Sequence, residues 1–156
     1  MPTALVFYVM IFRMEKGTDY IGISVVTICH DGNGKYLLEY RSDRCRDEHL
    51  TWSPIGSGGL RKEEKLETAV RREVEEECGA IPTDIEFLGH REVFRNIDGV
   101  DTHWIAFDFR AKINPAEVNI MEPDKCLKLE WFAVSDIPEP MHSQFPIFLE
   151  QHKDKL

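Results

Sequence analysis

The feature that most constrains this chain is a helical pattern whose apolar side becomes acidic. Residues Glu63–Glu77 have helical periodicity, and Gly79 follows where a left-handed cap would end the helix. At about 100° per residue, Leu66, Ala69 and Val70 share one side, which is typical of a helix packed on a sheet. The pattern therefore predicts a mixed α/β protein with this helix against its sheet.

Three acidic residues continue the apolar side in the last turns. Glu73 and Glu77 fall within about 20° of Leu66 on the helical wheel, and Glu76 lies beside Ala69. Carboxylates at these spacings repel one another, and partial burial makes each ionised form costlier, so they need cations or protons. Oxygen ligands of this kind suit Mg²⁺ or Mn²⁺. A solvated acidic helix end is the alternative interpretation.

The residues around this helix form a longer pattern with fixed spacing. In order, the pattern consists of Gly58, five residues, Glu64, seven residues, Arg72-Glu73-Val74, one residue, Glu76-Glu77, one residue, and Gly79-Ala80. This spacing resembles the signature of the Nudix (MutT-like) hydrolases at every invariant position. Only Ala80 is smaller than the bulky aliphatic residue that is usual there. We identify residues 58–80 as a Nudix box.

Three positions depart from the sequence that many relatives have. Ser57 and Glu63 stand where glycines are common, and Arg61 replaces a glutamate. The defining spacing is unchanged, so we expect the loop before the helix, rather than the helix itself, to differ from those relatives.

The resemblance implies a single domain over residues 1–156, folded as an α/β/α sandwich around a mixed β-sheet. It also implies that water attacks a phosphorus atom of a nucleoside diphosphate linked to another group, with Mg²⁺ or Mn²⁺ neutralising the diphosphate. In this sequence the implied metal ligands are Glu73, Glu76, Glu77 and the carbonyl of Gly58. Arg72 would hold the glutamates by ion pairing, and Glu64 and Gly79 would have structural roles.

The segment after residue 120 resembles the nucleoside-triphosphate diphosphatase branch of that family. It contains Met121-Glu122-Pro123-Asp124-Lys125-Cys126, then Glu130-Trp131-Phe132 and Asp136-Ile137-Pro138. Glu122 is a candidate for an additional catalytic carboxylate, as a metal ligand or as the base that orients water. An ordinary loop acid is the alternative.

Candidate substrate contacts lie outside the box. Arg41 and Arg46 belong to the main basic cluster, which would supply positive charge to phosphates, although such a cluster is also typical of a solvated loop. Trp52 and Phe94 are candidates for stacking on a nucleobase. Trp104 lies inside a predicted strand, which favours core packing.

Runs rich in β-branched and aromatic residues predict the strands, and Asp31-Gly32-Asn33-Gly34 predicts a hairpin over Tyr20–Tyr40. A second helix is predicted at Gln144–Lys153, after a proline-rich turn. The predicted strands are Ala4–Phe12, Tyr20–Cys29, Tyr36–Tyr40, Ile85–Phe94, Thr102–Ala111 and Leu127–Val134.

The formal charge of −9 argues against duplex nucleic acid as the main partner, because phosphate-backbone binding needs an excess of lysine and arginine. A small nucleotide remains compatible if metal ions supply positive charge. Four scattered cysteines favour a reducing, cytoplasmic setting, and the apolar stretch at Ala4–Phe12 is too short to span a membrane. That stretch could also pair with a second copy at a sheet edge, and we favour a homodimer.

The leading functional hypothesis is metal-dependent hydrolysis of a (deoxy)nucleoside triphosphate to monophosphate and diphosphate. ADP-ribose, a dinucleotide or a nucleotide sugar are alternative substrates within the same reaction. Alternatives from other classes are an isomerase of isopentenyl diphosphate on the same fold and a non-catalytic nucleotide sensor. The complete set Glu73, Glu76 and Glu77 argues against both.

Overall fold

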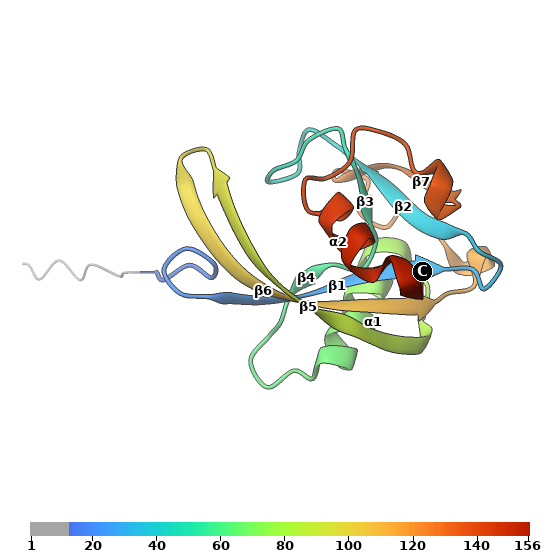
Figure 1. Ribbon diagram of the computed structural model, residues 1–156, viewed down its shortest axis with the longest axis horizontal. Coiled ribbons are helices and arrows are strands. Elements are labelled where there is room, and N and C mark those ends of the chain that lie inside the picture. Colours follow the sequence, from blue (N-terminus) through green and yellow to red (C-terminus); the bar gives the residue numbers. More distant parts are fainter. Residues whose placement is uncertain (1–12) are drawn as a thin grey trace, which may run out of the picture.

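The computed structural model describes residues 13–156, and Figure 1 shows its strands and helices. Two α-helices and three short 3₁₀ helices accompany the strands in this part of the chain. The strands are β1 Gly22–His30, β2 Tyr36–Arg41, β3 Trp52–Pro54, β4 Gly58–Gly59, β5 Thr83–Ile97, β6 Val100–Lys112 and β7 Cys126–Phe132. The helices are α1 Leu66–Cys78, α2 Phe145–His152, and 3₁₀ turns at Pro115–Glu117, Val134–Asp136 and Lys153–Lys155.

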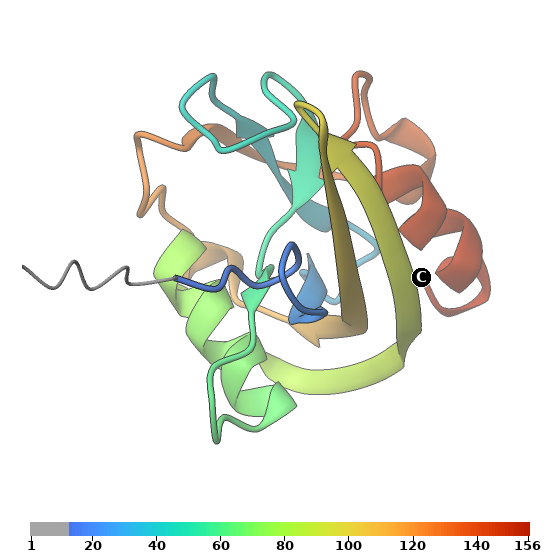
Figure 2. The same cartoon turned by 90° about the vertical axis from the view of Figure 1, so that its left-hand side faces the viewer.

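The strands form one mixed sheet with the order β3-β2-β1-β6-β5, in which β4 also pairs with β1 and β7 with β2. Strands β1 and β6 run parallel, whereas β5 and β6 form a long antiparallel hairpin. Helices α1 and α2 lie on opposite sides of this sheet (Figure 2). The predicted α/β/α sandwich around a mixed sheet is confirmed.

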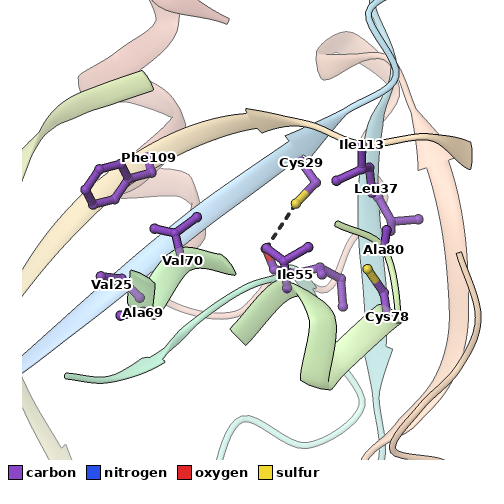
Figure 3. Packing of buried hydrophobic residues seen from close by; sticks show 11 residues of the cluster. Val25, Cys29, Leu37, Ile55, Ala69, Val70, Cys78, Ala80, Phe109 and Ile113 are labelled. Atoms are coloured by element: carbon purple, nitrogen blue, oxygen red, sulfur yellow. Dashed lines mark hydrogen bonds between the residues drawn. The ribbon is translucent and has the colours of Figure 1, made fainter. Parts of the chain in front are cut away.

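Each helix covers its own hydrophobic cluster. Under α1, Ala69 and Val70 pack on Val25 of β1 and Phe109 of β6, and the thiol of Cys29 donates a hydrogen bond to the Ile55 carbonyl (Figure 3). These side chains are buried, so the apolar stripe predicted from the sequence is the surface that attaches α1 to the sheet.

The second cluster lies under α2. Phe145 and Phe148 of α2 are almost fully buried against Ile28, Leu38 and Leu88 of the sheet. Burial of a large apolar side chain of this kind contributes about 1.5–3 kcal/mol, so these phenylalanines are the main attachment of the short helix.

Helix α1 begins three residues later than predicted, because the chain before it is not helical. Glu63 has a φ of 64°, in the left-handed region, and Lys65 is extended at the N-terminal cap. Glu63 therefore keeps a conformation that glycine adopts at lower cost, at the position where many relatives have glycine. The predicted end is confirmed, since Gly79 has a φ of 77° and its N–H donates to the Glu75 carbonyl.

Most of the other predicted elements are also present, with shifted ends. The hairpin at Asp31–Gly34 is confirmed only next to its turn, because β1 and β2 share the two residue pairs Cys29↔Leu37 and His30↔Tyr36 and then separate. Strands β3 and β4 were missed, since each is very short and contains proline or glycine. Helix α2 agrees within one residue at each end. The predicted strand Ala4–Phe12 lies outside the described residues.

None of the helices formed by residues 13–156 is long and apolar enough to cross a lipid bilayer.

Candidate active site

A cleft of about 490 Å³ opens where β1 and β2 separate. The hairpin of β5 and β6, which extends well beyond the rest of the sheet in Figure 1, forms another wall. Successive side chains of a strand point to opposite faces, so Thr102, Trp104 and Ala106 of β6 share the face that lines the cleft. Charged residues from several elements also line it, among them Glu39, Arg41, Arg46, Asp47, Glu77, Arg91, Arg95, Glu122 and Lys125.

Arg72 of α1 organises the residues of the box. Its guanidinium donates to both carboxylate oxygens of Glu64, at 2.7 and 3.0 Å, and to the Gly59 carbonyl at 3.2 Å. It also pairs with Glu73 and, at 3.3 Å, with Glu76. The bonds from Arg72 lower the pKa of Glu64 to about 2, and those from Glu64 raise the pKa of Arg72. Arg72 thus links the loop before α1 to Glu73 and Glu76 on the helix.

Gly58 and Glu73 lie in direct contact. Glu73 is buried, and a Cβ placed on Gly58 would lie 2.2 Å from the Glu73 carboxylate carbon. A residue with a side chain at 58 would therefore displace this carboxylate. Gly59 is different, because within residues 13–156 a Cβ there would meet only the Trp104 ring, at 3.9 Å.

Glu77 of α1 is a residue of the box that lines the cleft. Its carboxylate accepts a hydrogen bond of 2.7 Å from the Gly56 N–H, and burial, followed by the charge of Glu39, raises its pKa well above the usual value. Glu39 projects from β2 into the same cleft and accepts hydrogen bonds from Ser53 and Arg41. Burial raises the pKa of Glu39 too. Two carboxylates thus face a shared space, which favours a cation or a proton between them.

Glu39 was missed by the sequence analysis. The signal was an acidic residue inside the otherwise apolar run Tyr36–Tyr40, but which face of the strand it occupies depends on pairing with distant strands. The remaining acidic candidates lie closer to solvent. Glu76 is about half exposed and contacts Arg61 and Arg72. Glu122 lines the cleft and accepts a 2.8 Å hydrogen bond from Lys125.

The donor chemistry of the cleft fits a hard divalent cation. Among residues 13–156, no three His, Cys, Asp or Glu side chains come together so that they could hold a metal ion. Glu73 and Glu76 are paired with Arg72 instead. The Ser57 hydroxyl is buried beside Glu77 in the cleft lining, without a hydrogen-bond partner among the described residues. Oxygen ligands, carboxylates above all, are those that Mg²⁺ and Mn²⁺ prefer.

The predicted basic contacts lie at the cleft. Arg41 and Arg46 both line it, and Arg46 is largely exposed. Arg41 is fixed in place, since its guanidinium donates to Glu39 and to the backbone carbonyls of Asp47 and Glu48. The basic cluster is thus partly built into the wall of the cleft rather than fully solvated.

The aromatic assignments need correction. Trp52 is 8% exposed and packs against Tyr40 and Phe132 in the α2 cluster, so it has no free face toward the cleft. Phe94 points to the opposite face of β5 from the cleft residues on either side of it and stacks on His103, with ring centroids 4.3 Å apart. Trp104, which we expected in the core, lines the cleft instead.

A buried ionic cluster beside the cleft was not anticipated. Asp108 is fully buried and accepts hydrogen bonds of 2.6 and 2.9 Å from Arg91, and His152 of α2 lies 2.7 Å from it. Charged residues inside the apolar strands were the available signal, but their pairing joins positions far apart in the chain. The cluster attaches the end of α2 to β5 and β6.

Comparison with known proteins gives a consistent result. A family model described as the NUDIX domain matches residues 21–151. A MutT NUDIX hydrolase from Burkholderia pseudomallei has a TM-score of 0.73 and 29% identity, covering 83% of this chain and 96% of its own. A MutT protein from Methanosarcina mazei Go1 has a TM-score of 0.69 and 25% identity, covering 86% and 94%.

A more distant structure shares only the fold. The NUDIX domain of Shewanella oneidensis NrtR, in a cocrystal with ADP ribose, has a TM-score of 0.69 at 19% identity and covers 86% of this chain and 88% of its own. No curated protein matches the sequence significantly.

Proposed function

The chain belongs to the Nudix family and is a Nudix hydrolase, and on this premise we propose that it cleaves (deoxy)nucleoside triphosphates to monophosphate and diphosphate. Enzymes of this family are generally metal-dependent hydrolases of diphosphate linkages. One observation supports the proposal: Glu77, Arg41, Glu122 and Lys125 all line the same cleft. The cleft thus contains carboxylates that could bind a metal ion and basic side chains that could bind phosphate, and the reaction requires both.

We propose Mg²⁺ or Mn²⁺ as the metal, held by Glu73, Glu76 and Glu77 with the carbonyl of Gly58. When bound, such an ion neutralises phosphate oxygens and makes water more acidic. The role of Arg72 is to hold Glu73 and Glu76 near this position, and Glu64 fixes Arg72 in turn. Glu64 and Gly79 have structural roles in this account.

Other residues of the cleft would act on the substrate directly. Glu122 is proposed to accept the proton of the attacking water, because it lines the cleft from an element separate from α1. Arg41 and Lys125 would contact phosphate oxygens, and Arg46 would add charge at the exposed rim. Arg41 is already oriented by its bonds to Glu39 and to the loop at Asp47 and Glu48, which lowers the entropic cost of binding.

ADP-ribose is the second candidate substrate, since the NrtR domain of the same fold is found in complex with it. Dinucleotides and nucleotide sugars contain the same linkage. We further propose a homodimer in a reducing, cytoplasmic setting, on the grounds of the general frequency of symmetric dimers and four unpaired cysteines.

The test is metal-dependent hydrolysis of a panel of nucleoside triphosphates, ADP-ribose, dinucleotides and nucleotide sugars by wild type, Glu76→Gln and Glu75→Gln. Glu75 is exposed on the same helix and occupies a position that the box pattern leaves unspecified, so it is the matched control. We expect turnover of triphosphates that is lost in Glu76→Gln and kept in Glu75→Gln. Turnover of ADP-ribose alone would overturn the substrate assignment, and no turnover of any compound would favour a nucleotide sensor.

A further inference from the structure

Trp104 occupies an unusual place for a tryptophan in a central strand. Its ring belongs to neither of the hydrophobic clusters under α1 and α2. It is partly exposed and forms part of the cleft lining together with Gly58, Gly59 and Glu77. Among residues 13–156 the core therefore does not use this ring, and part of its surface faces the cleft.

Two glycines, Gly17 and Gly22, pack against the Trp104 ring. A Cβ on Gly22, the neighbour of Trp104 across the parallel β1–β6 pair, would lie 2.4 Å from ring atom Cε3. A Cβ on Gly17 would lie 2.1 Å from Nε1. Since neither position could hold a side chain without moving the ring, the backbone at these glycines packs directly against it.

Hydrogen bonds to backbone carbonyls fix the turn that carries Gly17. The N–H of His103 donates to the Gly17 carbonyl at 2.7 Å, and the ammonium of Lys16 donates to the Leu60 carbonyl at 2.8 Å. The turn that carries Gly17 is thus joined to β6 and to the segment after β4. A ring supported in this way loses little freedom when a second ring stacks on it.

From this geometry we propose that Trp104 is the stacking platform for the nucleobase, and hence that the substrate carries a planar heterocycle on its diphosphate. This rests on the proposed function. The ring lies beside Gly59, whose added Cβ would be 3.9 Å from it, so the platform adjoins the residues assigned to the metal and diphosphate.

A narrower cavity of about 130 Å³ between the sheet and α2 is the competing location for a base. Its aromatic residues are Phe145 and Phe148, which are 2% and 1% exposed. The guanidinium of Arg91 already lies over the Phe148 ring, 5.5 Å from its centroid. These rings offer no free face, so the observations favour Trp104.

The test compares two ligands whose P–C–P linkage blocks hydrolysis at the proposed site, an α,β-methylene nucleoside triphosphate and base-free methylenediphosphonate, both with Mg²⁺. In wild type, we expect the nucleotide to quench tryptophan fluorescence and the base-free compound not to. Trp104→Leu should bind the nucleotide about tenfold more weakly, with unchanged affinity for methylenediphosphonate, and Trp104→Phe should be intermediate. The control Trp131→Phe removes a tryptophan that packs against the α1 cluster and should keep the quenching.

Kinetics give a second readout. Trp104→Leu should raise KM for a nucleoside triphosphate and leave kcat nearly unchanged. Full nucleotide affinity in Trp104→Leu, or an equal loss for both ligands, would overturn the proposal. If nucleotides bind and quench the fluorescence but none is hydrolysed, the proposed function fails and the stacking role of Trp104 stands. If nucleotides are hydrolysed and Trp104→Leu leaves KM unchanged, the stacking role fails and the proposed function stands.

Discussion

Replacing Gly58 with alanine should strongly reduce kcat without unfolding the protein. The added Cβ would lie 2.2 Å from the Glu73 carboxylate carbon, about 1.2 Å short of the 3.4 Å at which ordinary contact begins. Glu73 is buried and paired with Arg72, so its carboxylate must leave this position. Glu73 is a proposed metal ligand, and a displacement of about 1 Å in such a group costs about a hundredfold in rate, so we expect kcat to fall by that factor.

The neighbouring glycine is the matched control. Gly59→Ala changes the same short strand by the same methyl group, but among the described residues its Cβ meets only the Trp104 ring, at 3.9 Å. We expect it to keep kcat within about threefold of wild type, since that contact is ordinary van der Waals packing.

The assay measures metal-dependent turnover of a nucleoside triphosphate, the Mn²⁺ affinity and the thermal unfolding of both variants. Gly58→Ala should also bind Mn²⁺ more weakly, with an unfolding midpoint close to that of wild type. Unchanged turnover in Gly58→Ala would refute the reasoning, and so would an equal loss in Gly59→Ala.

Further predictions concern stability. Glu63→Gly should raise Tm by about 2–4 °C, because φ is 64° at this position and glycine removes a strain of about 1 kcal/mol. Arg72 holds the pKa of Glu64 down to about 2, so Glu64 adds stability above its unfolded pKa near 4.5 that is lost as the pH falls toward 2. Glu64→Gln should accordingly flatten the acid limb of a urea-unfolding series, and an unchanged limb would contradict this. Arg91→Met leaves the buried Asp108 short of its main partner and should cost about 3–5 kcal/mol in urea unfolding. The control Arg44→Met breaks only an exposed pair and should cost under about 1 kcal/mol.

The local parts of the fold were predictable from the sequence. The apolar stripe of α1, its cap at Gly79 and the acids at its end follow from helical periodicity, which depends only on neighbours in the chain. The start of the helix was misplaced because Glu63 takes a backbone conformation that residue type alone does not favour. The short β3 and β4 gave no periodic signal, since strands this brief exist only by pairing with others.

The site was predictable only where its residues lie close in sequence. The box residues at 58–80 could be assigned by spacing, whereas Glu39 and Trp104 reach the cleft through strand pairing over long separations. A shift of one residue in register would have sent either side chain to the other face. The same dependence explains Phe94, which alternation in β5 turns away from the cleft.

The central claim is hydrolysis of the linkage between the α- and β-phosphates, and phosphorus NMR of the products tests it most directly. With wild-type enzyme and Mg²⁺, a nucleoside triphosphate should give nucleoside monophosphate and diphosphate in equal amounts. When the metal is removed by chelation, neither product should form. Release of orthophosphate and nucleoside diphosphate, or the same products without any divalent metal, would contradict the account.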